Sequence, residues 1–455
     1  MSKIEVNEIV KASGSTLTLG GCGTAVTLGS GATQTGFGRT GTVDWVTSIK
    51  TNSDSPLTVE SGKGYFLNTT SGTITVNLPA GSAGSIVAFR DYADTWDTNA
   101  VTVTPNGSDK IGGIAQNAVL DAEGQSVTLI FTDSTKGWLD IHDSTSNVKG
   151  AQFIAATGGT VTTVDTNFKV HTFTSPGTFC VSSAGNSAGS NSVSYMVVAG
   201  GGGTDKGGPG STGGGGGGGF REGLGTNDSY TGSPLRATTG VPVTATGFPV
   251  TVGAGGTGGP APGPGTAATQ GSSSIFSSIT SAGGGKSSGD GGSGGGGPTA
   301  TSPNLSPPQK GTGNTPPVTP PQGSTGGFGL STCGPGNPFI YRGGGGGGAT
   351  AVGGDASPSA GGAGGAGATT SINGSPTSFS GGGGGASGKE PSGGDVPSGA
   401  GGTGGGGAGG QRAAGTNGTT NTGGGAGGGG YGPSAVTQSG ATGGSGIVII
   451  RYKFQ

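Results

Sequence analysis

Runs of consecutive glycines constrain what this chain can fold into more than any other feature. Seven glycines follow one another at Gly213–Gly219, and shorter runs occur at Gly343–Gly348, Gly381–Gly385, Gly404–Gly407 and Gly427–Gly430. Glycine loses more conformational freedom on folding than any other residue, so such runs need an unusual source of order. A backbone without side chains cannot bury a core of its own, but it lets other backbones approach it from every side.

The regular structure that these runs predict is the left-handed, threefold polyproline II helix. Its N–H and C=O groups form no bonds within the helix, so they bond laterally to neighbouring helices. A helix surrounded by others needs glycine on every face, which accounts for uninterrupted runs. At about 3.1 Å per residue, seven glycines span roughly 22 Å. We therefore expect a polyglycine II-type helical bundle.

The glycines are concentrated in one part of the chain. Residues 199–455 hold 90 of the 115 glycines and 22 of the 26 prolines. Strand-like segments flank this part, at Asn167–Val181 and Val193–Ala199 before it and at Ile447–Phe454 after it. Pairing of Val193–Ala199 with Ile447–Phe454 would close the region into one domain. This flanking pattern argues against a disordered linker.

The first part of the chain has the pattern of short β-strands. Segments rich in β-branched residues alternate with glycine-, proline- and asparagine-containing turns, at Thr73–Leu78, Ser85–Phe89, Ala100–Thr104 and Ser126–Phe131. This spacing predicts a sandwich or β-prism-like module. No long segment has helical periodicity. The expected fold class is therefore all-β and fibrous, with short-strand modules followed by the glycine bundle.

Three domains follow from these patterns. Residues 1–50 are too poor in large side chains to fold alone, so we expect an N-terminal segment that packs against other chains. Residues 51–149 form the β-sandwich-like module, and residues 150–455 form the glycine-rich domain. Trp45, Trp96 and Trp138 all lie in the first part, and core or inter-chain packing is the favoured interpretation for each. A sugar-stacking platform is the alternative, above all for Trp96.

Few residues suggest catalysis. The chain has only His142 and His171, and no metalloprotease, zinc-binding or nucleophile-elbow motif. We expect no enzyme activity, catalytic residue, metal or cofactor. Asp91, Asp94 and Asp97 form the acidic cluster beside an aromatic residue. An exposed turn is the favoured interpretation, and glycan hydrolysis by paired carboxylates is a minor alternative.

Charge and hydropathy exclude two classes of partner. The net charge is −2 without a basic block, which argues against nucleic acid or an anionic membrane. The apolar run Ile447–Ile450 is too short to cross a bilayer, and the first residues lack the apolar region of a secretory signal. Three widely spaced cysteines make no disulfide framework.

The connectors between the glycine runs carry most of the aromatic and charged residues of this half. Rigid scaffolds that display variable loops are a common design of binding proteins. We therefore expect the connectors to form binding loops, with these candidate contact residues: Phe220, Arg221, Tyr230, Arg236, Phe339, Tyr341, Arg342 and Arg412.

Three stretches resemble the tail fibres of marine, cyanophage-like bacteriophages. The opening MSKIEVNEI…LTLGGCG…VTLGSGATQTGFGRTGTVDWVTSIK resembles their N-terminal region. The segment SGKGYFLNTTSGTITVNLPAGSAGSIVAFRDYA…GQSVTLIFTD…GWL resembles their β-rich module. The segment FTSPGTF…VSYMVVAGGGG…GGSGIVIIRY resembles their terminal glycine-rich domain. Together these stretches cover nearly the whole chain.

This resemblance implies a homotrimeric tail fibre of the virion, made in the host cytoplasm. Its N-terminal segment, residues 1–50, would be the attachment and trimerising segment and would join other virion tail proteins. Its distal loops would bind a bacterial surface receptor, either lipopolysaccharide or an outer-membrane protein. No binding residue is matched one to one, because the loops of such fibres differ freely. Two alternatives stay open: a purely structural virion fibre or decoration protein, and a polysaccharide-cleaving spike.

Overall fold

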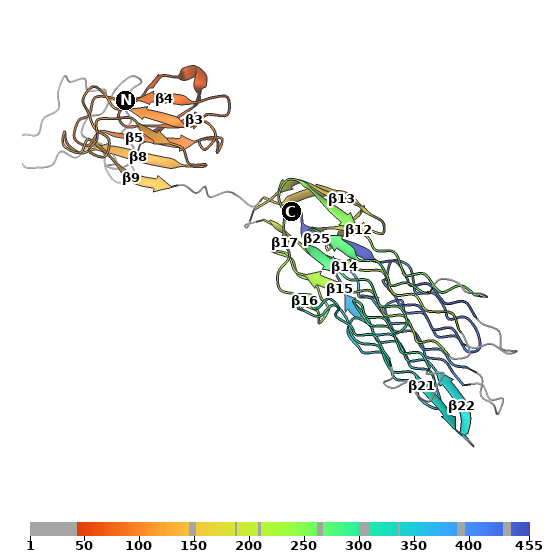
Figure 1. The fold of residues 1–455 in the computed structure, drawn as a ribbon. Helices are drawn as coiled ribbons and strands as arrows, with labels where there is room; N and C mark the ends of the chain where they lie inside the picture. The colour runs from red at the N-terminus through yellow and green to blue at the C-terminus, as the bar shows by residue number, and fades with distance from the viewer. Residues whose placement is uncertain are drawn as a thin grey trace, which may run out of the picture. The chain divides into compact units, whose positions relative to one another are not determined.

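The computed structural model describes residues 43–144, 152–186, 189–207, 211–261, 267–299, 309–334, 337–388, 396–430 and 438–455. The chain forms two compact units, Met1–Val148 and Lys149–Gln455. In the described residues the regular structure is β, apart from one 3-10 turn at Asn52–Asp54 (Figure 1). The predicted all-β, fibrous fold class is confirmed. Most of the expected attachment segment 1–50 lies outside the described residues.

The first unit is a sandwich of two sheets. One sheet has the order β1-β3-β5-β8-β9 and the other the order β2-β4-β6-β7. Their bounds are β1 Asp44–Thr51, β2 Leu57–Thr58, β3 Lys63–Asn68, β4 Ile74–Asn77, β5 Ile86–Asp91, β6 Val101–Thr104, β7 Ala118–Leu120, β8 Ser126–Phe131 and β9 Trp138–Ser144. The four strands that the alternating pattern predicts correspond to β4, β5, β6 and β8.

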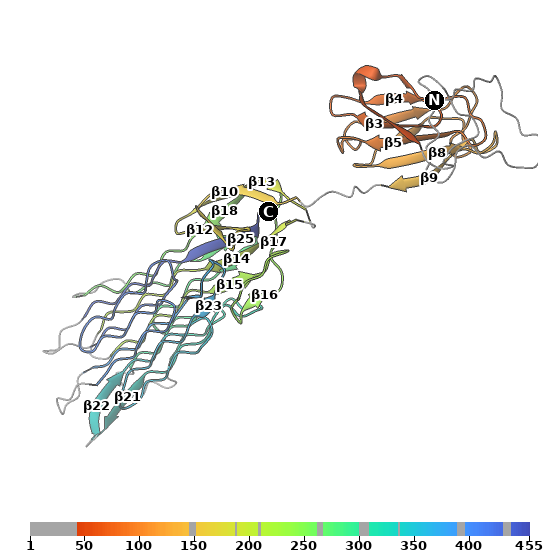
Figure 2. The ribbon, with the colours of Figure 1, turned by 180° about the vertical axis from the view of Figure 1, so that it is seen from behind.

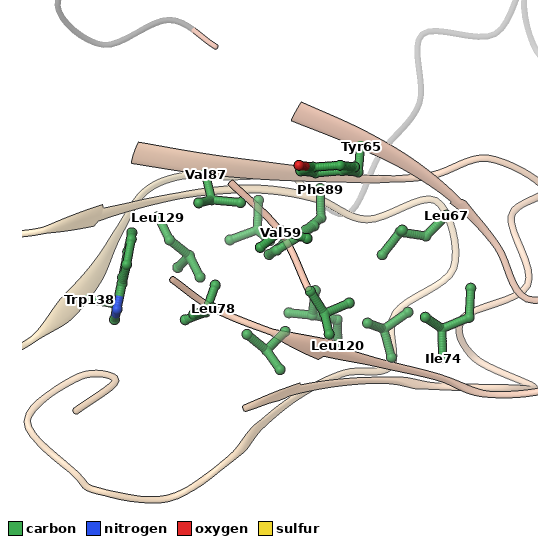
Figure 3. Close-up of a cluster of buried hydrophobic side chains, with 14 of the residues drawn as sticks. Val59, Tyr65, Leu67, Ile74, Leu78, Val87, Phe89, Leu120, Leu129 and Trp138 are labelled. Carbon is green, nitrogen blue, oxygen red and sulfur yellow. The ribbon is translucent and has the colours of Figure 1, made fainter. Parts of the chain in front are cut away.

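The chain alternates between the two sheets from β1 to β6. Each strand therefore lies beside the strand two positions away in sequence, and these neighbours are parallel: β1 with β3, β3 with β5, β2 with β4 and β4 with β6. Antiparallel pairing appears only later, at β6–β7, β5–β8 and β8–β9. The inward residues of both sheets form one apolar core. Figure 3 shows Phe89 and Leu129 from one sheet facing Ile74 and Leu120 from the other.

The second unit begins with two more sheets. One has the order β10-β13-β18-β19-β20, and the other the order β11-β12-β25-β14-β15-β16, with β17 beside β14. Their bounds are β10 Ile154–Thr157, β11 Thr160–Val164, β12 Phe168–Phe173, β13 Gly177–Ala184, β14 Ser192–Val198, β15 Phe220–Gly223, β16 Arg236–Ala237, β17 Val241–Pro242, β18 Gly247–Thr251, β19 Ser274–Phe276, β20 Ile279–Ser281 and β25 Ile447–Lys453.

The strands that flank the glycine-rich region in sequence are neighbours in space. β14 pairs antiparallel with β25, from Ser194 opposite Arg451 to Val198 opposite Ile447, as the sequence predicts. Both strands are buried on both faces. Alternate residues of the two strands pack against the first sheet on one side and, on the other, against apolar residues that include the short hairpin of β23 Ala368–Thr370 and β24 Thr377–Phe379.

Extended glycine-rich segments occupy the rest of this unit. We call them the glycine rods: they carry no strand or helix pattern and run side by side between the sheets and the distal hairpin of β21 Leu330–Gly334 and β22 Asn337–Arg342 (Figures 1 and 2). Four of the five runs singled out in the sequence lie in rods. The run Gly404–Gly407 differs, because Thr403–Gly405 is a turn in which Gly404 and Gly405 have φ of 96° and 93°.

Candidate functional site

The rod Gly213–Gly219 shows how the glycine-rich unit is held together. Its N–H groups repeat their partners every three residues. Gly214 and Gly217 donate to Gly344 and Gly347, Gly215 and Gly218 donate to Ala426 and Gly423, and Gly216 and Gly219 donate to Gly285 and Ala282, all at 2.8–3.0 Å. The partner numbers rise in the first pair and fall in the other two, so one of these neighbours is parallel and two are antiparallel.

The carbonyls of the same rod bond to three further segments. Gly296, Gly202 and Gly383 donate their N–H groups to Gly214, Gly216 and Gly215 at 2.8–2.9 Å. One rod therefore bonds to six others, and every face of its backbone is used. The repeat of three is that of a polyproline II helix, which has three residues per turn.

Close packing of backbones explains why these runs tolerate no side chain. A Cβ atom added at Gly346 would overlap the carbonyl group of Gly215, and one at Gly215 would overlap that of Gly202. The same holds at Gly382 and Gly383, which face the carbonyl groups of Gly346 and Ala426. The obstacle is backbone in each case and cannot rotate away.

Rods at the surface of the unit carry a different sequence pattern. In Gly253–Pro260, every third residue is buried, starting at Gly253, and every third residue is exposed, starting at Ala254. Glycine fills the buried positions, while alanine, threonine and proline occupy the exposed ones. The sequence GGAGGAG at 361–367 likewise exposes Ala363. Among the segments that form rods, uninterrupted glycine thus indicates an interior rod, and glycine interrupted at every third position indicates a surface rod.

The eight candidate contact residues fall into two groups at opposite ends of the rods. The rod Gly213–Gly219 connects them: Ser211 at its start donates from Oγ to the carbonyl of Tyr341 at 3.1 Å, and its end runs into β15. One group lies at the sheet end: Phe220, Arg221, Tyr230 and Arg236. The other lies at the distal end with the β21–β22 hairpin: Phe339, Tyr341, Arg342 and Arg412 (Figure 1).

The group at the sheet end is largely part of the interior. Phe220 does not project from a loop as expected; it begins β15 and is 1% exposed, in the core with Met196 and Phe379. Arg221 follows in the same strand, half-buried opposite Val197. Phe220 is the first large side chain after seven glycines, so it enters the apolar layer where the rod meets the sheet.

Tyr230 and Arg236 belong to a buried charge network. The guanidinium of Arg236 lies 5.2 Å from the Tyr230 ring, and that of Arg451 lies 5.3 Å from it. Arg451 is fully buried, and its Nε donates to Asp228 at 3.0 Å. Burial, together with the Glu222 and Asp228 carboxylates, raises the pKa of the Tyr230 hydroxyl far above its ordinary value. The network attaches the loop after β15 to the sheet that contains β14 and β25.

The sequence pattern missed three members of this network. Glu222 is 1% exposed and accepts bonds from Thr370 Oγ1 at 2.5 Å and from the N–H of Ser233 at 2.9 Å. Asp228 accepts from Ser194 Oγ at 2.6 Å, and Arg451 sits inside the apolar run that ends the chain. The sequence signal for this buried ion pair is the charged residue Arg451 directly after the apolar residues Ile447–Ile450.

The distal group is joined through backbone contacts. Tyr341 is half-buried, and its carbonyl accepts a bond from the N–H of Gly388 at 3.1 Å. Arg342 is buried, contrary to its expected place in an outward loop, and its Nη1 donates to the Gly388 carbonyl at 3.3 Å. Arg412 is half-buried, and its N–H donates to the Ser387 carbonyl at 3.2 Å. Phe339 lies in β22, and its side chain is outside the described part.

The residues weighed for catalysis have structural positions. Trp96 is fully buried, so it offers no sugar platform, and Trp138 is buried as well, while Trp45 is 40% exposed. Asp91 is 1% exposed and accepts bonds from the N–H groups of Trp96 and Gly124, both at 3.1 Å, which corrects its expected place in an exposed turn. Across the described ranges there is no cluster of acidic, histidine or cysteine residues that could hold a metal. The same ranges contain no helix able to span a membrane.

Comparison with known proteins finds a family match for each part of the chain. Residues 174–453 match the family described as a glycine-rich domain, and because this is more than half of the chain, the protein belongs to that family. Residues 6–141 match the N-terminal region of bacteriophage T4 gp9/10-like proteins. The chain is also similar to the baseplate wedge protein gp10 of Enterobacteria phage T4, with 34% identity over 83 residues.

That match covers 18% of this chain and 14% of the T4 protein, so this chain spans a small fraction of its relative's length. The family matched by residues 6–141 and the T4 relative are both bacteriophage proteins, and the T4 relative is a baseplate protein. The comparisons therefore support a bacteriophage tail-associated protein with a structural role in the virion.

Proposed function

We propose that this chain is a tail fibre that attaches the virion to the host cell surface through the distal end of its glycine-rich domain. One observation carries the proposal: the two ends of the glycine rods are unlike. The sheet end holds both the first strand of the unit, β10, and its last, β25 (Figure 2). The distal end carries neither, and gathers segments around Tyr341, Ser387 and Arg412.

The rods suit the role of a rigid scaffold. We infer that they are polyglycine II-type helices, because the partners of Gly214–Gly219 repeat every three residues. Each interior rod is bonded on all sides, so bending one would break bonds to several neighbours. Loops at the distal end would then be held at a fixed distance from the sheets.

The remaining parts of the proposal concern assembly. Residues 1–50 would attach to other virion tail proteins and bring three chains together, residues 51–149 would form a spacer module, and residues 150–455 would face the host. The match of residues 6–141 to gp9/10-like proteins supports a tail location for the first two parts. The receptor would be lipopolysaccharide or an outer-membrane protein. No enzymatic step is part of this function.

Among the eight candidates, the distal four belong to the receptor site that we propose. Tyr341 and Arg412 are partly exposed there, whereas Arg342 is buried and would position its neighbours. Phe220, Tyr230 and Arg236 are explained by the core and the charge network at the other end. A large aromatic residue and an arginine are the residue types that contribute most to binding energy at interfaces.

A purely structural role in the virion is the second candidate. The similarity to a baseplate wedge protein supports it, since that relative is named for its place in the baseplate. In that case the glycine rods would serve as a stiff spacer, and the distal end would have no specific ligand.

Two matched arginine variants test the proposal. Labelled full-length protein carrying Arg412→Asn or Arg221→Asn would be measured for adsorption to a panel of candidate host cells. Asparagine suits position 412, where φ is 57°. We expect Arg412→Asn to lose about tenfold in affinity, as for an interface contact of about 1.4 kcal/mol, and Arg221→Asn to bind like wild type. Equal binding by both variants would contradict the distal site, and no binding by the folded wild type to any cell would favour the structural role.

A further inference from the structure

The strand β11 is an open edge of the sheet β11-β12-β25-β14-β15-β16 in the glycine-rich unit. It pairs antiparallel with β12 over five residues, and no strand of the described part of the chain lies on its other side. Its sequence, TVTTV, is uncharged and β-branched throughout, and four of its five residues are exposed. Val161 alone leaves 45% of its surface exposed. Such an edge offers free N–H and C=O groups to any extended segment.

In the four larger sheets of the described residues, every edge strand except β11 is protected. Natural proteins blunt their edges with bulges, charges, proline or short strands. β1 has an irregular register and carries Asp44 and Lys50, and β9 pairs through a bulge and carries Asp140 and Asp143. β10 also contains a register shift, and the edge strands β2, β7, β16 and β20 are only two or three residues long. β11 has a regular register and none of these devices.

The edge is also held firmly in place. At its start, Gly158 and Gly159 turn the chain from one sheet to the other, with φ of 112° and 63°. At its end, Asp165 is bound at 3.0 Å by the buried guanidinium of Arg451. Between them, Lys169 Nζ donates to Thr163 Oγ1 at 2.7 Å. A fixed, exposed edge reduces the entropy that pairing would cost.

We propose that β11 pairs with β11 of a second copy of this chain, antiparallel and about a twofold axis at Thr162. The strand is suited to pair with its own copy, because none of its five residues is charged. On one face of the pair, Val161 lies opposite Thr163. On the other face, Thr160 lies opposite Val164, and Thr162 lies opposite its own copy. A twofold contact cannot close a ring of three chains. In the proposed three-chain assembly, the pairing therefore joins chains of neighbouring fibres at the sheet end of their glycine-rich units. This placement rests on the proposed function, whereas the pairing itself does not depend on receptor binding.

Disulfide trapping tests the pairing in full-length protein in which Cys22, Cys180 and Cys333 are replaced by serine. In the proposed register Thr162 faces its own copy, so Thr162→Cys gives disulfide-linked dimers under mild oxidation. The matched control is Thr251→Cys. Thr251 is also exposed, but it lies on β18, a strand that pairs with β13 on one side and with β19 on the other. We expect at least tenfold more dimer from Thr162→Cys, and equal yields would overturn the proposal.

A mixed experiment checks the register. Chains of different tag length carrying Val161→Cys or Thr163→Cys would be combined before oxidation. The antiparallel pairing predicts that the mixed dimer exceeds either self-dimer severalfold. If Thr162→Cys forms dimers but the mixed dimer of Val161→Cys and Thr163→Cys does not exceed the self-dimers, the twofold strand pairing is overturned. Thr162→Lys should abolish the association seen by analytical ultracentrifugation, with the thermal unfolding of the chain unchanged.

Discussion

The two units of this chain both contain β-sheets, but their interiors are built from different groups. The first unit places 16 buried apolar residues in one cluster between two sheets. In the glycine rods the interior is the backbone itself, with Gly215, Gly346 and Gly383 surrounded by carbonyl groups. The first unit follows the common plan in which burial of apolar side chains is the dominant favourable term. The rods depend on hydrogen bonds that are individually worth about 1 kcal/mol.

This difference teaches where each unit is vulnerable. A side-chain core suffers when atoms are removed, because the cavity cannot close completely. A backbone core suffers when atoms are added, because there is no space between adjacent rods. The rods also need the sheets at one end, where Phe220, Met196 and Phe379 supply the apolar layer that the glycines lack. Three substitutions separate these behaviours.

The largest effect is expected from removing a buried aromatic side chain in the first unit. Phe89 is fully buried, so Phe89→Ala should cost about 4 kcal/mol of the free energy of unfolding. Trp45, Trp96 and Trp138 all lie in this unit, so denaturant unfolding followed by tryptophan fluorescence reports on it alone. Hydrogen exchange in residues 199–455 should be unchanged. A loss of protection there would show that the units unfold together.

Adding one methyl group to an interior rod should destabilise the glycine rods and leave the first unit unchanged. Gly346→Ala drives a Cβ into the carbonyl group of Gly215 and should cost about 3 kcal/mol, seen as faster amide exchange across the rods. The tryptophan transition should stay where it is. Ala363→Ser is the control: it also adds one atom to a rod, but at an exposed position, and should change stability by less than about 0.5 kcal/mol. Similar effects of the two variants would rule out a close-packed backbone core.

The smallest effect concerns pH and the sheet end. Burial lowers the pKa of the His171 imidazole, although its bond with the Gly158 carbonyl acts in the opposite direction. The unfolded chain therefore takes up this proton at a higher pH than the folded chain does. Stability should be full above pH 6.5 and should fall as the pH drops through this value, by at most about 1.4 kcal/mol per pH unit.

Hydrogen exchange of β12 and β25 between pH 7.5 and 5.5 measures this effect. His171→Gln should remove most of the pH dependence, whereas His142→Gln, at an exposed position, should leave it unchanged. An equal pH dependence in wild type and His171→Gln would assign it to other groups.

Local patterns predicted much of the fold, since alternation and turn residues are local signals. The segments around β4, β5, β6 and β8 and the pairing of β14 with β25 follow from them. The parallel neighbours in the first unit do not, because alternation tells which face a residue takes and not which strand lies beside it. The predictions from the sequence did not distinguish surface rods from interior rods, although the repeat GGAGGAG at 361–367 indicates a surface rod.

The candidate site was predicted less well than the fold. The connectors contain the expected aromatic and basic residues, but the sequence cannot tell at which end of a rod each connector lies. Rods run in both directions, so the end reached depends on how many rods precede a connector. Phe220 and Arg342 are adjacent in sequence to glycine runs, and each is buried where its rod ends. Burial of this kind depends on long-range packing that no local pattern records.

The place of β25 in the sheet has a consequence for how the protein is made. β25 is the centre of its sheet, between β12 and β14, yet it is synthesised after all the rods. While the residues between Val198 and Ile447 are being synthesised, no strand joins β12 to β14. The Asp228 carboxylate also lacks its ion-pair partner Arg451 until the end of β25 has been made. Contacts so distant in sequence form slowly. A chain that stops anywhere in the rods therefore lacks the central strand of this sheet, so that the sheet closes only in products that include β25.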